Sequence, residues 1–412
     1  MIKNKQNSQN RIIFLSQNRI NISSHQRNKG AIIIEGHVQG LSNTRSLGAA
    51  GVPVIVVDTG GNCVAKHSKY CTEFHKCPAY ESDDLADFLV ELARNKKLDG
   101  WLLLPSNDHA VLTLSRNKSR LEEFYKLITP DLNIIENIYD KSRLLEKARA
   151  VAVPVPCTFY AQDADITDFA LNFPVITRGR FGLDFYKAAG RKAFLASDIE
   201  ELREQLAFIE RHISAPNTLT QELIPDDGTN KTISFCAFCV AGDIKTFWMG
   251  EKLREHPVRF GTATFARSVY VEECYSQSIP LLKALNYTGV CEVEYLKDPR
   301  DGQYKLIEIN ARTWLWVELA RACGVDLAKL AYEYVNGIDS QYPQKYETGL
   351  CWINPFTDVA YAAKSVFKGQ LNPIKYVKTL LKRKKANALF VRDDVKPGLA
   401  YFASMYNFLK NR

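Results

Sequence analysis

The sequence contains no long hydrophobic run. No uninterrupted apolar segment approaches the roughly 20 residues that a helix needs to cross a bilayer. The apolar segment nearest the N-terminus, residues 12–15, is too short to form the core of a secretory signal. We therefore expect a protein that neither spans a membrane nor follows the secretory route, and we expect to find it in the cytoplasm.

Two segments of the chain lack acidic residues. Residues 1–34 contain six Lys or Arg and no Asp or Glu, and residues 359–392 contain nine Lys or Arg and again no acid. Because the whole chain has a net charge of +8, removing these fifteen positive charges leaves −7 for everything else. The basic character thus belongs to the two ends, and the body offers no basic groove for nucleic acid.

A second metal-binding cysteine pair is also missing. Cys236 and Cys239 have the spacing of a zinc knuckle, but no other pair among the ten cysteines matches it. These two and Cys291 and Cys323 lie in apolar stretches. Reduced, buried thiols are therefore the favoured interpretation, with a zinc site as the less favoured alternative.

The pattern after residue 30 predicts an α/β domain with a parallel sheet. The chain has 412 residues, of which 46% are hydrophobic, enough for two or three domains. Continuous apolar runs predict strands at residues 31–34, 52–58 and 100–105, and helical spacing predicts helices at residues 42–50, 85–94 and 110–124. Fully apolar strands that alternate with helices are typical of a parallel sheet covered on both faces. The loop at residues 36–40 carries two glycines, which serve chain geometry or, alternatively, hold a small anionic or acceptor ligand.

The pattern changes at residue 139. Helices are predicted at residues 141–149, 163–171 and 198–211, and strands at residues 153–159 and 173–178, with alternating strands from there to residue 310. This second part therefore reads as α+β.

A hairpin near residue 300 brings charged residues together. If its turn is centred on Asp301, Glu294 pairs with Glu308 and Glu292 pairs with Asn310. Because side chains alternate along a strand, Glu294, Glu308, Asn310 and Arg312 point the same way.

Such a face suits a divalent cation. Two opposed carboxylates repel each other unless a positive charge lies between them, and carboxylate and amide oxygens are ligands for Mg²⁺. We predict a magnesium site from Glu294, Glu308 and Asn310, with a merely solvated polar face as the alternative.

Four motifs resemble those of the ATP-grasp ligases. They are Lys141 at a helix start after Asp140, the strand that ends at Arg178, residues 221–225 (Gln-Glu-Leu-Ile-Pro), and the hairpin end at residues 308–312. Their order fits from about residue 31 to 340, and the chain is most similar to carbamoyl-phosphate-synthase-like carboxylate–amine ligases, including the D-aspartate ligases of cell-wall synthesis. The resemblance implies a leader (1–30), an α/β pre-ATP-grasp domain (31–138), an ATP-grasp domain (139–340, flap subdomain about 155–220) and a basic, aromatic extension (341–412).

The resemblance also implies a role for each motif residue. The ATP-binding residues would be Lys141, Arg178, Lys192 or alternatively Lys187, Gln221, Glu222, Leu223, Ile224 and Asp227. Residues 179–190 would form the flap over the triphosphate, Glu222 and the backbone after it would meet the adenine, and Asp227 the ribose. Arg312 would face the transferred phosphate. Arg254 and Arg267 would meet the substrate carboxylate or acceptor, with exposed strand charges as the alternative.

The activity implied is an ADP-forming ligation. A substrate carboxylate would attack the γ-phosphate of ATP, with Mg²⁺ or Mn²⁺ as cofactor, and an amine would displace phosphate from the acyl phosphate. The product would be an amide or peptide-like bond, with a role in cell-envelope glycan or peptidoglycan precursor synthesis. The alternatives are a nucleotide-binding sensor or assembly factor without ligase activity, and a phosphotransferase on the same fold.

The basic tract near the C-terminus is amphipathic. Apolar residues alternate with lysines over residues 364–385, and Pro373 divides the tract into two shorter pieces. Peripheral contact with an anionic membrane is one interpretation, and packing of the apolar side on the domain is the alternative.

Overall fold

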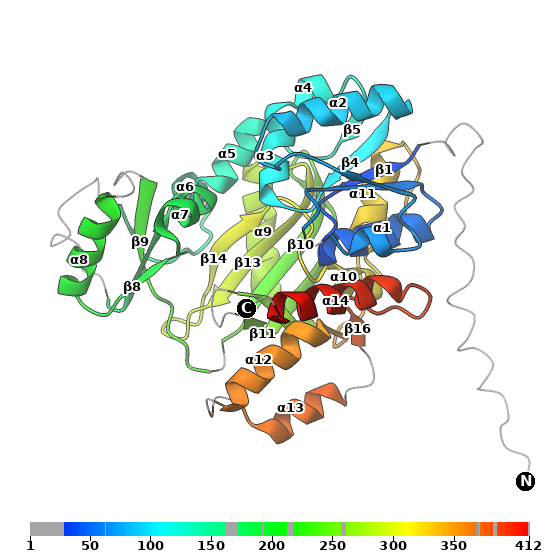
Figure 1. Ribbon diagram of the computed structural model, residues 1–412. Coiled ribbons are helices and arrows are strands. Elements are labelled where there is room, and N and C mark those ends of the chain that lie inside the picture. Colours follow the sequence, from blue (N-terminus) through cyan, green and yellow to red (C-terminus); the bar gives the residue numbers. More distant parts are fainter. Residues whose placement is uncertain are drawn as a thin grey trace, which may run out of the picture.

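The computed structural model shows three sheets with helices packed around them (Figure 1). It describes residues 29–61, 63–160, 172–191, 193–211, 217–228, 230–256, 261–367, 369, 371–381 and 385–410. In this part of the chain, no helix is both long and apolar enough to pass through a membrane.

The first sheet is the predicted parallel sheet. Its order is β3 (Glu73–Lys76), β2 (Val54–Asp58), β1 (Ala31–Ile34), β4 (Trp101–Pro105) and β5 (Tyr125–Leu127), and every neighbouring pair is parallel. Helices α1 (Val38–Ala49), α2 (Asp84–Lys96), α3 (Asp108–Arg116) and α4 (Lys118–Leu121) accompany it, with the short 3₁₀ helix η2 (Ala65–His67). Ile33 belongs to one buried cluster and Ile32 and Ile34 to another, so both faces of β1 are covered, as the all-apolar strand predicts.

Two predicted helices differ from those observed. The segment predicted as a loop at residues 36–40 already enters α1, which begins at Val38. Residue 40 needs to be glycine, since a Cβ there would lie 2.0 Å from the Glu35 carbonyl oxygen. The predicted helix at residues 110–124 is two helices, α3 and α4, separated at Asn117. It also begins earlier, since the Asn107 side chain accepts a hydrogen bond from the Ala110 N–H and caps α3.

The second sheet has seven strands and forms the centre of the molecule. Its order is β14 (Tyr304–Asn310), β13 (Gly289–Lys297), β10 (Thr232–Val240), β11 (Asp243–His256), β12 (Thr262–Ser268), β15 (Cys351–Ile353) and β16 (Lys385–Asn387), antiparallel except for the last pair. Cys236 and Cys239 on β10 belong to different buried clusters and therefore lie on opposite faces of the sheet. Two sulfurs placed in this way do not share a metal.

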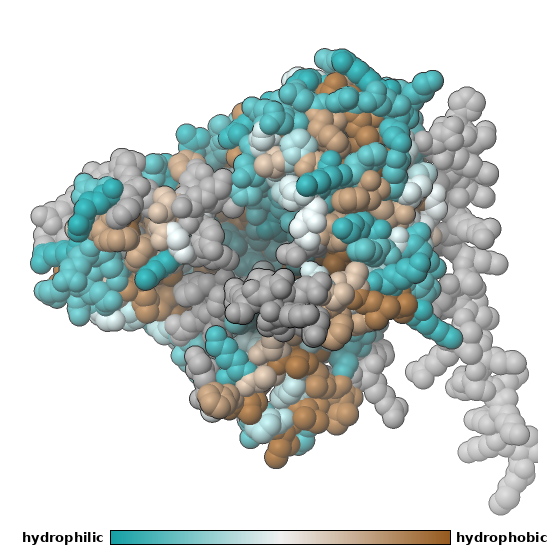
Figure 2. Space-filling model, viewed as in Figure 1, coloured by the Kyte–Doolittle hydropathy of each residue, from teal (hydrophilic) through white to brown (hydrophobic). Residues whose placement is uncertain are grey.

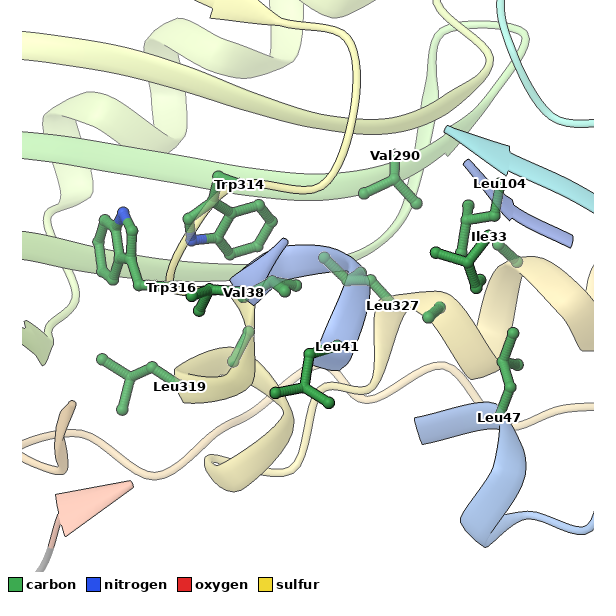
Figure 3. Close-up of a cluster of buried hydrophobic side chains, with 14 of the residues drawn as sticks. Ile33, Val38, Leu41, Leu47, Leu104, Val290, Trp314, Trp316, Leu319 and Leu327 are labelled. Carbon is green, nitrogen blue, oxygen red and sulfur yellow. The ribbon is translucent and has the colours of Figure 1, made fainter. Parts of the chain in front are cut away.

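The first and second sheets share one hydrophobic core. Val38 from α1 lies near Trp314 and Trp316, which follow β14, and Ile33 from β1 lies on the side of Val290 from β13 (Figure 3). This contact fixes the carboxyl edge of the parallel sheet against the end of the β13–β14 hairpin.

The third sheet forms a separate lobe, at the left of Figure 1. It is antiparallel, in the order β6 (Thr158–Phe159), β9 (Thr218–Glu222), β7 (Val175–Gly179) and β8 (Phe194–Ala196), with helices α7 (Gly182–Ala189) and α8 (Ile199–Glu210). The strand predicted at residues 153–159 is much shorter because Pro154 and Pro156 have no N–H to donate. The helix predicted at residues 163–171 lies outside the described residues.

The remaining helices connect and cover these sheets. They are α5 (Leu132–Tyr139), α6 (Lys141–Ala150), α9 (Glu272–Ala284), α10 (Val317–Ala322), α11 (Leu327–Val335), α12 (Pro355–Phe367), α13 (Pro373–Leu380) and α14 (Lys396–Lys410). The predicted break at Pro373 is confirmed, because α12 ends at Phe367 and Pro373 opens α13.

Candidate functional site

The β13–β14 hairpin has the predicted register. Glu294 pairs with Glu308 and Glu292 with Asn310, and a bulge follows Glu294 before the strands continue to the turn. The three carboxylates and the amide thus lie on one face of the hairpin.

Two lysines from distant elements relieve the repulsion between these carboxylates. Lys252 Nζ on β11 donates to Glu294 Oε1 at 2.7 Å, and both side chains are almost fully buried. Lys141 Nζ at the start of α6 donates to Glu308 Oε2 at 3.4 Å. Glu292 accepts hydrogen bonds from Ser234 Oγ at 2.8 Å and from Asn310 Nδ2 at 3.0 Å.

The carboxylates differ in their affinity for a proton. Burial works to raise the pKa of Glu308, but the charges of Lys141, Arg178 and Lys252 outweigh it and hold that pKa well below its usual range. Burial and the neighbouring charge of Glu294 raise the pKa of Glu292. Glu308 therefore holds a proton less readily than Glu292 does.

These oxygens fit a hard divalent cation. The described residues include no group of three His, Cys, Asp or Glu side chains that could hold a metal ion by themselves. Carboxylate and amide oxygens with room for water and phosphate oxygens are the usual setting of Mg²⁺, which keeps several waters and binds through one or two carboxylates. The residues present thus fit Mg²⁺ shared with a phosphate better than a closed protein cage.

Lys141 and Arg178 are two half-buried cations beside Glu308. Burial and the charge of Arg178 lower the pKa of Lys141, and burial lowers the pKa of Arg178. Among the described residues no hydrogen-bond acceptor meets the buried Nε of Arg178, and its Nη2 donates only weakly to the Ile307 carbonyl at 3.5 Å. A guanidinium with an unused buried donor is suited to an anion such as a phosphate.

Arg312 joins the hairpin to the parallel sheet. Its Nε and Nη2 donate to the two carboxylate oxygens of Asp108 at 2.9 Å each, and Nη2 also donates to Asn310 Oδ1 at 3.2 Å. Asp108 follows β4 at the carboxyl edge of the parallel sheet. The site is therefore assembled where two sheets meet.

Glu35 lies at the same edge, directly after β1. Its backbone is left-handed, with φ of 76°, and burial raises the pKa of its carboxyl group to about 7. Gln39 Nε2 donates to Glu35 Oε2 at 2.8 Å. Glu35 follows β1 and Asp108 follows β4, and these two strands are neighbours in the sheet at the point where the strand order reverses. Open α/β sheets bind ligands in the crevice at the carboxyl ends of two such strands, so Glu35 and Asp108 flank that crevice.

The predicted adenine residues surround the end of β9. Glu222 is buried, and its Oε1 accepts from the N–H and Nδ2 of Asn172, while its Oε2 accepts from Arg300 Nη1 at 3.0 Å. The Leu223 N–H donates to the Pro174 carbonyl, and Gln221 Nε2 donates to Thr158 Oγ1. Ile224 is buried, and Asp227 is exposed with its Oδ1 accepting from the Asn230 N–H. The carboxylate predicted to meet adenine already has protein partners, and its role stays a prediction.

Of the other predicted residues, the two arginines are paired with acidic side chains and the two lysines have no described side chain. Lys187 is on α7, without a described side chain, and Lys192 lies outside the described residues. Arg254 donates from Nε and Nη2 to Asp358 at 2.7 and 2.8 Å, and Arg267 donates from Nε to Glu251 at 2.5 Å. Both substrate assignments stay predictions, and the Arg254 pair ties β11 to α12.

The structure places four residues in the site that the sequence did not assign to it: Lys252, Asp108, Glu35 and Glu292, which bonds with Asn310. Lys252 is on β11 and Glu294 on β13, with β10 between them, so their approach depends on the register of two strand pairs. Glu292 carried a local signal, since it is two residues before Glu294 and so on the same face.

Figure 2 shows a recess with hydrophilic walls between the lobe that contains α7 and α8 and the rest of the protein. The hairpin face described above opens toward this junction, since Lys141 N–H and Arg180 C=O join the start of α6 to the end of β7.

Comparisons with known proteins point to one superfamily. The family model described as carbamoyl-phosphate synthase L chain, ATP binding domain, matches residues 170–341. A D-aspartate ligase from Enterococcus faecium is 23% identical over 271 residues, which is 62% of this chain and 64% of that ligase. The match thus spans less than two thirds of the ligase.

Solved structures show the same fold. N5-carboxyaminoimidazole synthetase from Staphylococcus aureus, solved with ADP, has a TM-score of 0.62 at 17% identity and covers 83% of this chain and 87% of its own. The biotin carboxylase domain of Hydrogenobacter thermophilus 2-oxoglutarate carboxylase, solved with MgADP and bicarbonate, has a TM-score of 0.60 at 16% identity, over 78% of this chain and 73% of its own. The predicted resemblance is confirmed at the level of one domain and of the fold: residues 170–341 match the ATP-binding domain of the carbamoyl-phosphate synthase L chain, and the fold is that of the ATP-grasp ligases.

Proposed function

We propose that the protein is an ADP-forming ligase that joins a carboxylate to an amine at the expense of ATP. The observation that carries this proposal is the half-buried pair Lys141 and Arg178 beside Glu308, in which the buried Nε donor of Arg178 has no acceptor among the described residues. A triphosphate supplies the missing acceptors. The D-aspartate ligase similarity agrees with the ligation of an amino acid.

Each side chain then has a physical task. Lys141 and Arg178 hold phosphate oxygens, while Glu294, Glu308 and Asn310 hold Mg²⁺, or Mn²⁺ in its place. When bound, the metal would neutralise part of the negative charge on the phosphate oxygens.

Arg312 faces the phosphate that is transferred and neutralises part of its charge. It is itself fixed by two hydrogen bonds to Asp108.

The substrates enter at the crevice between the two sheets. The carboxylate attacks the γ-phosphate of ATP, releasing ADP and forming an acyl phosphate. The nitrogen lone pair of the amine then attacks the acyl carbon, the C–O bond to phosphate breaks, and inorganic phosphate leaves. Exclusion of water by closure of the lobe protects the acyl phosphate from hydrolysis.

The test compares Glu308→Gln with Glu273→Gln, an exposed glutamate on α9. Thermal shift with MgATP measures nucleotide binding, and release of ADP and phosphate is measured against a panel of carboxylates and amines. We expect stabilisation of the unaltered protein and of Glu273→Gln, with ADP and phosphate formed together, and neither effect in Glu308→Gln.

Other outcomes select the alternatives. Stabilisation without ADP from any pair would favour a sensor, and ADP without free phosphate would indicate a phosphotransferase. Unchanged turnover in Glu308→Gln would refute the site.

The place of the reaction in the cell is a further part of the proposal. A role in envelope glycan or peptidoglycan precursor synthesis, in the cytoplasm, is supported by the D-aspartate ligase resemblance. The division into a leader (1–30), an α/β domain (31–138), an ATP-grasp domain (139–340) and an extension (341–412) is also part of the proposal. The first sheet lies within residues 31–138, whereas β15 and β16 of the extension pair with the second sheet through β12.

A further inference from the structure

Helix α12 packs with its apolar side outward. Its buried positions are Asp358, Ala362 and Ser365, one helical stripe of polar or small side chains. Val359 and Val366 flank this stripe and are exposed, and Phe367, on the opposite side at the end of the helix, is 94% exposed. A surface helix of a globular protein normally has the reverse arrangement.

Helix α13 repeats this arrangement. Ile374, Val377 and Leu381 are spaced by three and four residues, form one stripe, and are exposed, with Ile374 at 66% and Leu381 at 72%. Its inward side is held by Arg254, which donates to Thr379 Oγ1 at 3.1 Å and lies over the Tyr376 ring, 5.1 Å from its centre. The apolar stripe thus faces solvent while the other side of α13 is held in place by Arg254.

The anchor of both helices is one buried ion pair. Arg254 donates to both oxygens of Asp358, which is fully buried on α12, and Thr264 Oγ1 donates to the same carboxylate at 3.0 Å. Such a pair sets the orientation of α12, so its apolar side cannot turn inward without leaving Asp358 unpaired. Figure 2 shows the resulting hydrophobic surface at the bottom of the view, over α12 and α13.

We call this surface the apolar face and define it by Val359, Val366, Phe367, Ile374, Val377 and Leu381. The sequence around it is strongly basic, with nine Lys or Arg and no acid over residues 359–392. Lys364 and Lys378 are exposed on the same two helices. Exposed apolar side chains among lysines are characteristic of helices that lie in the interface of an anionic membrane.

We propose that the apolar face docks on the surface of a membrane that contains anionic phospholipid. Phe367, Ile374 and Leu381 enter the acyl boundary, and the lysines around them meet the headgroup phosphates. A second copy of the chain is a poorer occupant, because a symmetric dimer through this face would bring two uncompensated basic segments together. This inference does not depend on the proposed ligase activity.

The test measures binding of the full chain, without ATP, to vesicles of phosphatidylglycerol and phosphatidylcholine and to vesicles of phosphatidylcholine alone. Phe367→Ser with Ile374→Ser removes apolar contacts, and Lys364→Gln with Lys378→Gln removes charge. The matched control is Leu195→Ser with Ile279→Ser, which replaces two exposed apolar residues elsewhere on the protein. All these side chains are exposed, so the fold should be retained, and thermal unfolding checks this.

We expect binding to the anionic vesicles only, weakened by salt. The Phe367 and Ile374 double variant should lower the partition coefficient about tenfold, and the control should not change it. Absence of binding to anionic vesicles, or equal loss in the control, would overturn the proposal. A dimer in light scattering that the same double variant abolishes would assign the face to a second copy and would likewise overturn it.

Discussion

Replacement of Lys252 by Met should make the protein depend on Mg²⁺ for stability. At 2.7 Å, two unit charges attract by about 6 kcal/mol if the effective dielectric constant is near 20. The variant loses this attraction, but the free energy needed to remove the lysine from water is lost as well. The net decrease in the free energy of unfolding expected for breaking such a pair is about 3–5 kcal/mol. For a chain of 412 residues that unfolds in one step, that loss corresponds to a melting temperature lower by about 4–6 °C.

Magnesium should recover part of this loss. Without Lys252, Glu294 and its neighbour Glu292 are buried with no lysine between them, and a divalent cation can take its place. At a concentration one hundred times its Kd, a ligand stabilises the folded state by about 2.7 kcal/mol. The assay is thermal unfolding at neutral pH with and without Mg²⁺, in the absence of ATP.

Two further variants control this experiment. Lys118→Met breaks a pair whose partner, Asp131, is mostly exposed, so the expected cost is below about 1 kcal/mol and Mg²⁺ should have little effect. Lys252→Met with Glu294→Gln removes both charges of the buried pair and should recover stability without added metal. If Lys252→Met costs no more than Lys118→Met, or if Mg²⁺ raises both equally, the cation-site reasoning fails.

Three other substitutions test the remaining assignments. Glu222→Ala should raise the KM for ATP about tenfold, as expected from the loss of one charged hydrogen bond, and leave the KM for the carboxylate unchanged; equal changes would count against an adenine role. Asp108→Asn should lower kcat about tenfold with ATP affinity retained, because Arg312 loses its bidentate partner, and steady-state kinetics against binding titration would show it. Arg254→Met should lower stability by about 3–5 kcal/mol, which urea unfolding measures, and adding Asp358→Leu should restore it; a raised substrate KM in that stable double variant would support the substrate role of Arg254.

The sequence predicted the elements whose signals are local. The parallel sheet followed from all-apolar strands, which need cover on both faces, and β1 indeed supplies two clusters. The pairing of Glu294 with Glu308 followed from the turn at Asp301, because a hairpin fixes register by counting from its turn. The bulge after Glu294 lies between these pairs and the turn, yet the predicted pairs hold.

The sequence could not predict contacts that depend on several elements at once. Lys252 meets Glu294 only because β10 separates β11 from β13 by a single strand, and that order is a property of the whole sheet. The apolar side of α12 points outward because Asp358 must meet Arg254 on β11. From periodicity alone, packing of that apolar side was the simpler expectation.

The pair of Asp108 and Arg312 shows why a site of this kind forms where two sheets meet. The two residues are 204 positions apart, and each belongs to a segment just beyond a strand end. Their approach depends on the core shared by α1 and the residues after β14, where Val38 packs near Trp314. Loss of packing in that core would therefore move Arg312 relative to Glu308, since Arg312 is held by the parallel sheet and Glu308 by the hairpin. The hydrophobic contact that joins the sheets thus also sets the geometry of the charged site.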